Sequence, residues 1–235
     1  IIPAMKYFAD GDDPHYAMLS HYYYGKTLLN QNKLSDAIIA CNKATDFAIG
    51  LNNDFYLGLI YGTLGDIYNK IHNHNESINY NRLSYLYFHK INKQPHEKYA
   101  YFSLAISHNN NGDFHESQKI FKELIDSAII NSDTIFMVEV LESYSHLLWN
   151  NQKDSQAKLI LTSLQNKYNH RLSSKSLAHL ANIYSKEGLQ DSTKYYLDLA
   201  KNRILDKNDS IAITQSEYII SYNDKDYKYA FDNLY

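Results

Sequence analysis

Small and large apolar positions recur along this chain at a fixed spacing. Larger side chains, mostly apolar, stand one position before and three positions after a small residue, as Leu64 and Tyr68 flank Gly65. The small residues are 40 positions apart, and a second small residue follows each of them 12 positions later: Gly25 and Ala37, Gly65 and Ser77, Ala105 and Ser117, Ser145 and Ala157. A fixed period of about 20–50 residues is typical of stacked supersecondary units. The spacing therefore predicts a repeat protein built from pairs of helices.

The paired small residues have a mechanical role in such a repeat. Small side chains on two facing helices let the backbones approach closely, while the larger neighbours fill the next groove. From one small position to the next the period runs 40, 40, 40, 36 and 37 residues, through Ala181 to Tyr218. Two helices and two turns per period predict helices of about 16–18 residues. The sixth unit is degenerate, because Tyr218 occupies its small position.

The pattern resembles the tetratricopeptide repeat (TPR), which runs Trp-x2-Leu-Gly-x2-Tyr and then Ala-x3-Phe-x2-Ala. The best matches are LGDIY at 64–68, NGDFHESQKIFKEL at 111–124 and LANIYSKEG at 180–188. The resemblance covers about residues 14–235 and is carried by the set of repeats together. It implies an all-α fold, a right-handed α-α superhelix (TPR-like solenoid) of five to six helix hairpins.

We expect one solenoid over residues 1–235, cut from a longer array. Projecting the register in both directions gives the tail of an earlier repeat and then six units: 1–11, 14–51, 54–91, 96–131, 133–169, 172–206 and a partial unit at 209–235. Residues 4–38 are also similar to the TPR regions of Bacteroidetes proteins, which are often regulatory or membrane-associated. This similarity implies a periplasmic or membrane-tethered protein, with the cytoplasm as the alternative compartment.

Composition and charge narrow the range of partners. The formal net charge is −3, and the 23 Lys and Arg residues are spread singly, which argues against binding to nucleic acid. No apolar stretch approaches the roughly 18 residues of a membrane span. A single cysteine, Cys41, excludes a disulfide framework within the chain.

The sequence contains no recognisable catalytic motif. A nucleophile elbow, an HExxH metal motif, a P-loop and a dinucleotide-binding glycine motif are all absent. His72 and His74 are two positions apart in an expected turn, with only Glu76 as a further neighbouring ligand, so we interpret them as a solvated turn rather than a metal site. We therefore expect a binding protein that is not an enzyme and that uses no cofactor or metal.

The resemblance implies that the first helix of each hairpin lines a concave groove that binds a protein or an extended peptide. The family's ligand-facing pattern positions fall on the following residues: Tyr22, Tyr23, Lys26 and Asn30; Asp66, Asn69 and Lys70; Tyr99, Phe102, Asn109 and Asn110; Glu142, His146, Trp149 and Asn150; His179, Asn182 and Lys186. The family's carboxylate clamp, a set of Lys, Asn and Arg residues that binds the C-terminus of a ligand, is not reproduced.

Amide side chains recur among these candidates near the expected helix ends. Asparagines there could hydrogen-bond the backbone of an extended peptide, or they could simply end the helices and form turns. Trp149, the only tryptophan, could likewise anchor a ligand or pack in the core. Two functions stay open: a scaffold that assembles protein partners, and the sensory region of a signalling or transcriptional regulator whose effector domain lies outside this chain.

Overall fold

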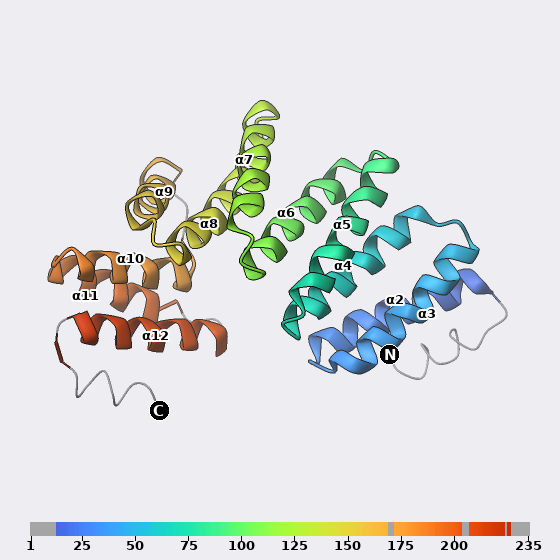
Figure 1. Cartoon of the computed structure of the whole chain (residues 1–235), viewed down its shortest axis with the longest axis horizontal. Helices are drawn as coiled ribbons and strands as arrows, with labels where there is room; N and C mark the ends of the chain where they lie inside the picture. Colours follow the sequence, from blue (N-terminus) through green and yellow to red (C-terminus); the bar gives the residue numbers. More distant parts are fainter. Residues whose placement is uncertain (1–12, 169–171, 204–206, 224, 227–235) are drawn as a thin grey trace. The chain divides into compact units, whose positions relative to one another are not determined.

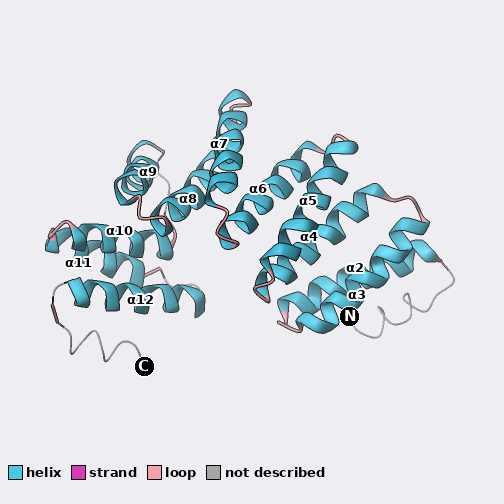
Figure 2. Cartoon of the chain, in the orientation of Figure 1, coloured by secondary structure: helices cyan, strands magenta, loops and turns pink. Residues whose placement is uncertain are grey.

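The computed structural model describes residues 13–168, 172–203, 207–223 and 225–226. These residues form eleven α-helices and no strand (Figures 1 and 2), which confirms the all-α prediction. The tail predicted at residues 1–11 and the second helix of the partial sixth repeat lie outside the described residues. None of the described helices is long and apolar enough to cross a membrane.

The chain divides into two compact units, residues 1–124 and 125–235. Unit 1 contains five complete helices and the first part of a sixth, each 17 residues long: α2 (Pro14–Asn30), α3 (Leu34–Gly50), α4 (Asp54–Lys70), α5 (His74–Lys90), α6 (Gln94–Asn110) and α7 (Phe114–Ile130). Consecutive helices pack together from α2 to α6, and the first helices α2, α4 and α6 also contact one another in succession. The predicted helix length is therefore confirmed in this unit.

The paired small residues meet where the two helices of a hairpin cross. The hydroxyl of Ser77 donates a hydrogen bond to the carbonyl of Gly65 at 2.9 Å, and Ser117 does the same to Ala105 at 2.7 Å. A Cβ atom added to Gly25 would lie 2.7 Å from the Sγ of Cys41. The spacing of 12 residues thus marks a close backbone approach, as the pattern predicted.

Three-residue turns connect the helices from α2 to α9. The middle residue of each turn is left-handed, with a positive φ, and these residues stand 20 positions apart: Asn32, Asn52, His72, Asn92, Gly112, Ser132 and Gln152. In the first turn, the N–H of Asn32 donates to the carbonyl of Leu29, and the N–H of Lys33 to that of Leu28. These bonds satisfy carbonyls that a helix end would otherwise leave unpaired. The 40-residue repeat is therefore two 20-residue helix-and-turn elements.

Unit 2 contains the end of α7, then α8 (Thr134–Asn150), α9 (Asp154–Lys167), α10 (Ser174–Lys186), α11 (Gln190–Lys201) and α12 (Lys207–Asn223). Helices α9, α10 and α11 have 14, 13 and 12 residues, so the predicted length of about 16–18 residues is wrong for these three helices. Their shorter length accounts for the shorter repeat period in this part of the sequence. Helix α10 contacts α8, α9, α11 and α12, so most of its side chains are buried.

Candidate functional site

The predicted site residues of unit 1 lie on its three first helices. Short turns make neighbouring helices antiparallel, so α2, α4 and α6 run in the same direction and their C-terminal ends lie along one edge. We call the surface formed by these helices the first-helix face of unit 1. Figure 1 shows α2, α4 and α6 in this order along the unit.

Two of the predicted asparagines bind each other across this face. The Nδ2 of Asn110, on α6, donates to the Oδ1 of Asn69, on α4, at 2.8 Å. Asn110 is exposed and Asn69 is half-buried. Both stand in the last turn of their helices, and neither occupies the left-handed turn position, which falls on His72 and Gly112. The pair therefore links two successive repeats and keeps further amide groups open to solvent.

Charged side chains stand beside the amide pair. Asp66 on α4 is exposed, yet the protein surrounding it raises the pKa of its carboxyl to about 6 by desolvation, while Lys26 and Lys70 act in the opposite direction. The side chain of Asp66 thus reaches solvent, but protein atoms around its carboxyl group reduce the hydration of the charged form. The nearby positive charges of Lys26 and Lys70 come from α2 and α4, so two repeats contribute to one polar region.

The aromatic candidates divide into exposed and buried rings. Tyr23 and Tyr99 are 53% and 43% exposed, whereas Tyr22 and Phe102 are 4% and 8% exposed. The hydroxyl of Tyr22 hydrogen-bonds with Thr63 and burial raises its pKa to about 12. Phe102 meets the ring of Phe121 edge-on, with centroids 6.0 Å apart, so it belongs to the core of its hairpin. Of the remaining candidates, Asn30 is exposed and Asn109 is half-buried.

In unit 2, Glu142 connects α8 to the start of α10. Its Oε1 accepts hydrogen bonds from the N–H of Ser173 at 2.8 Å and from the hydroxyl of Ser176 at 2.6 Å. An anionic acceptor at a helix N-terminus satisfies an unpaired N–H group and interacts favourably with the helix dipole. Glu142 thus stabilises the beginning of the next repeat's first helix.

His146 joins the same network in its neutral form. Because Ser176 donates its hydroxyl to Glu142, it accepts from the Nε2–H of His146, at 2.7 Å. Burial and the charge of Lys175 lower the pKa of His146 to about 4, against the opposing effect of Glu142. The imidazole is therefore neutral at pH 7, with its proton on Nε2.

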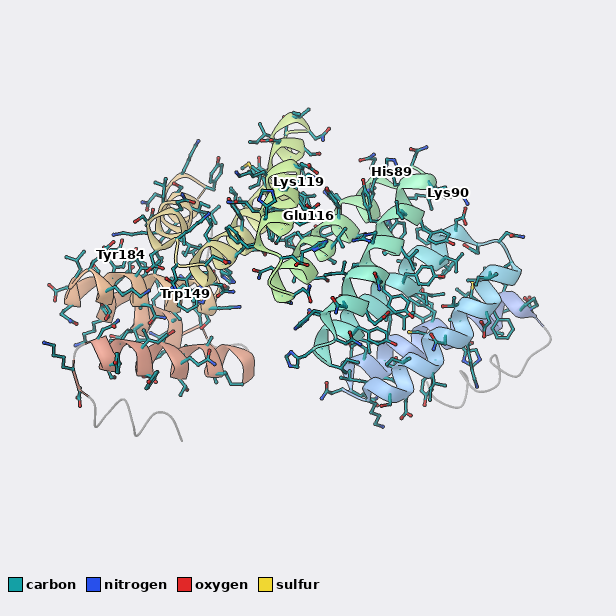
Figure 3. The ribbon with its side chains drawn as sticks, viewed as in Figure 1. His89, Lys90, Glu116, Lys119, Trp149 and Tyr184 are labelled. Carbon is teal, nitrogen blue, oxygen red and sulfur yellow. The ribbon has the colours of Figure 1, made fainter. Side chains whose placement is uncertain are left out.

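Trp149, His179 and Asn182 continue this network between α8 and α10, because the rings of His146 and His179 meet edge-on with centroids 4.8 Å apart. The rings of Trp149 and His179 stack with centroids 3.9 Å apart and planes 13° apart, and Figure 3 shows Trp149 where α8 approaches α10. His179 and Asn182 are only 5% and 1% exposed, while Trp149 is half-buried. Desolvation, followed by the charges of His146 and Lys175, lowers the pKa of His179 well below its usual value.

The last two candidates of unit 2 lie at helix ends. Asn150 is exposed, and the Nζ of Lys186 forms an ion pair with the Oδ2 of Asp154 at 2.7 Å. The structure thus brings Glu142, His146, His179 and Trp149 into one connected group, because the rings of His146 and His179 meet edge-on with centroids 4.8 Å apart. Asn182 follows His179 by one turn of α10 and binds Ser216. The predicted binding role of each of these residues stays a prediction.

Several residues of these networks could not be found from the repeat pattern. Ser173 and Ser176 bind Glu142, Thr63 binds Tyr22, and Ser216 of α12 binds Asn182 at 3.1 Å. Hydroxyl residues at such positions carry no signal of their own, because their partners come from other repeats. Among the described residues, no group of three His, Cys, Asp or Glu side chains could hold a metal ion.

Comparison with solved structures shows that the fold is similar to that of TPR-like helical repeat proteins. Three similar structures are a Rap protein complexed with Competence and Sporulation Factor (13% identity, TM-score 0.74), the Rap conjugation gene regulator of plasmid pLS20 with the Phr* peptide (13%, 0.74) and kinesin light chain TPR-like repeats from Podosopora anserina (13%, 0.63). They match 97%, 94% and 82% of this chain. At this identity the likeness shows the fold alone.

The chain spans 66% and 63% of the length of the two Rap structures and 96% of the kinesin light chain structure. The chain is thus shorter than the proteins that were solved with a bound factor or peptide. No family model matches the sequence, and no curated protein does either.

Proposed function

We propose that this chain is a non-catalytic module that binds an extended peptide or a protein segment on its first-helix faces. The hydrogen-bonded pair of Asn69 and Asn110 carries this proposal. One similar structure, a Rap protein, was solved with Competence and Sporulation Factor, and another, the Rap conjugation gene regulator, with the Phr* peptide. These complexes support a peptide as the ligand of this chain.

The amide pair has the chemistry needed to bind a peptide backbone. Once Asn110 has donated to Asn69, the pair still has donor hydrogens on both Nδ2 atoms and an acceptor on the Oδ1 of Asn110. An extended peptide presents N–H and C=O groups in alternation, so both kinds of group can be bound at once. Because backbone groups are the same in every peptide, this contact supplies affinity without strict sequence selection.

The mutual hydrogen bond also holds the two side chains in place before a ligand arrives. Immobilising a flexible side chain on binding costs about 0.5–1.5 kcal/mol, and a preformed pair has already lost much of that freedom. The exposed ring of Tyr23 and the charges of Lys26 and Asp66 lie on the same face and can contact ligand side chains. Selectivity would come from these residues.

A random dodecapeptide display library panned on the full chain tests the proposal. Enriched peptides are synthesised with a fluorescent label, and their affinity is measured by anisotropy for the parent and for the double variant Asn69→Ala/Asn110→Ala. Loss of about two hydrogen bonds predicts an affinity at least tenfold weaker.

Asn42→Ala is the matched control, because Asn42 is an exposed asparagine on the second helix α3. It should bind the peptides as the parent does, and circular dichroism should show equal helix content in all three proteins. If no peptide is enriched, or if the enriched peptides bind the double variant as tightly as the parent, the amide pair is not a binding site.

A second candidate function, from a different class, is the sensory region of a regulator. One similar structure is named a conjugation gene regulator and was solved with a peptide, which favours this alternative. In this case peptide binding would change the activity of a further domain of the same protein. The sequence of the complete gene beyond Tyr235 tests this alternative, because a DNA-binding or kinase domain there would support a regulator.

A further inference from the structure

Four buried polar atoms in unit 2 have no hydrogen-bond partner among the described residues, and three of them belong to neighbouring side chains. These three are the Nε1 of Trp149, the Nδ1 of His179 and the Oδ1 of Asn182. The indole stacks on the imidazole, and Asn182 follows His179 by one helical turn on the same side of α10. We call these three residues the indole–imidazole cluster. Buried polar groups are nearly always paired, so their partner is expected to be a molecule outside the chain.

The hydrogen-bonding capacity of the cluster can be assigned from its surroundings. Ser216 donates its hydroxyl to the carbonyl of Ala212 at 2.8 Å, so it can only accept from the Nδ2 of Asn182. This interaction fixes the amide orientation and leaves the Oδ1 of Asn182 as a free acceptor. The indole Nε1–H of Trp149 can only donate. A ligand must therefore offer an acceptor to the indole and a donor to the amide oxygen.

The hydrogen-bonding groups of the cluster favour a neutral ligand group over a carboxylate. A carboxylate has no hydrogen to donate and would place negative charge beside the Oδ1 of Asn182. The charged groups near the cluster are Lys175 on α10 and Glu142 on α8, and Glu142 is occupied by Ser173 and Ser176. A neutral amide supplies both a carbonyl acceptor and an N–H donor, and it avoids the desolvation of a charge.

We propose that the indole–imidazole cluster binds an amide group of the ligand, whose carbonyl accepts from the Nε1–H of Trp149 and whose N–H donates to the Oδ1 of Asn182. The inference rests on the proposed function, because a peptide supplies such amides either in its backbone or in the side chains of Asn and Gln. Trp149 is the partly exposed member of the cluster and stacks on His179, so the ligand reaches the cluster from the side of the indole.

Trp149 is the only tryptophan among the 235 residues, so its fluorescence reports on this cluster alone. The full chain is titrated with three small probes, N-methylacetamide for a backbone amide, propionamide for a side-chain amide and propionate for a carboxylate of similar shape. The inference predicts a saturable change in tryptophan emission with one or both amides, at millimolar concentrations expected for so few atoms. It predicts no saturable change with propionate. The amide that binds more tightly identifies the source.

Asn182→Leu removes the acceptor while keeping a similar side-chain volume. Because Ser216 keeps its bond to Ala212, this variant leaves no new unpaired group and should melt at or above the parent's temperature. The response of its emission to the amide probes should be at least tenfold weaker. A purely structural role of Asn182 predicts instead a lower melting temperature and an unchanged response.

The inference is overturned if amides and propionate act alike, if the response does not saturate, or if Asn182→Leu responds as the parent does. N-acetyltryptophanamide measured in the same solutions corrects for direct quenching of the indole. These probes need no peptide, so their failure leaves the panning experiment and the Asn69–Asn110 pair untouched. Failure of the panning experiment, in turn, leaves the response to the amide probes measurable.

Discussion

The close contact between α4 and α5 can be tested by adding one methyl group at Gly65. A Cβ atom built there would lie 2.4 Å from the Oδ1, 2.6 Å from the Cγ and 2.7 Å from the Nδ2 of Asn81. Asn81 is 2% exposed, and its Nδ2 donates to the hydroxyl of Ser107, in the next repeat, at 2.8 Å. Gly65→Ala must therefore move a buried amide that connects two hairpins.

The expected loss of stability follows from three contributions. Overpacking of a tight helix contact costs about 1–3 kcal/mol, and disruption of the buried hydrogen bonds of Asn81 costs about 1–3 kcal/mol more. The higher helix propensity of alanine returns about 1 kcal/mol. The net destabilisation is about 3 kcal/mol, which lowers the melting temperature by about 10 °C.

Gly50→Ala is the matched control, since a Cβ atom at Gly50, the last residue of α3, would meet no atom within 4 Å. It should leave the melting temperature unchanged or raise it slightly. Asn81→Ala in the Gly65→Ala background should recover about 2 kcal/mol, because the obstructing amide is removed. If calorimetry finds that Gly65→Ala melts no lower than Gly50→Ala, the inferred backbone approach is wrong.

Three further predictions concern the ends of helices and the buried histidines. Glu142→Gln should lower the stability of unit 2 by about 1–2 kcal/mol in a thermal melt, because the charged acceptor at the start of α10 is lost. Gly112→Ala should lower stability by about 1 kcal/mol although a Cβ atom there has room, since the φ of +84° is unfavourable for any other residue. The folded-state pKa of His146 is lowered to about 4 from the ordinary value of 6.5, so the folded protein binds fewer protons than the unfolded chain between these values. The neutral imidazole of His146 therefore contributes fully to the free energy of unfolding above pH 6.5. This contribution is lost as the pH falls towards 4, and the loss amounts to about 3 kcal/mol at most. Urea unfolding across this range should show that loss in the parent and in the exposed-residue control His115→Gln, but a smaller one in His146→Phe.

The repeat architecture was predictable because it depends on spacing rather than on any single residue. The pairs Gly65 with Ser77 and Ala105 with Ser117 must be small wherever two helices touch, so the requirement recurs in every repeat. These small positions reflect a steric condition that the sequence repeats several times. The helix length was less predictable, because α9 to α11 have only 12–14 residues although the same length was expected for every repeat.

The 20-residue period of the turns was not visible in the sequence. Asparagine and glycine tolerate the left-handed conformation, but His72, Ser132 and Gln152 occupy the same position in other turns. Stable packing of the flanking helices holds these residues in a conformation that they rarely adopt, so residue type alone does not identify the site. This is why the predicted asparagines of the last helical turn could not be separated from turn asparagines beforehand.

The candidate site was predictable only to the level of the helix face. The pattern placed Asn69 and Asn110 at neighbouring pattern positions of successive repeats, and the structure brings their side chains together. The same rule placed His179 and Asn182 on the ligand-facing side of α10, where they are buried. Their burial depends on α8 and α12, which both contact α10, and no local pattern encodes how closely successive helices approach.

The two units therefore offer a ligand different chemistry at equivalent repeat positions. In unit 1 the asparagine pair is solvent-accessible and needs no rearrangement to bind, so it can form the first contact with a peptide. In unit 2 the unpaired atoms are buried, and of the three residues only Trp149 is partly exposed. An unpaired buried polar group costs about 1–3 kcal/mol, so a ligand amide that pairs with Trp149 and Asn182 would recover part of that free energy. We therefore expect such a ligand to stabilise unit 2 more than unit 1, whose asparagines are already paired with each other.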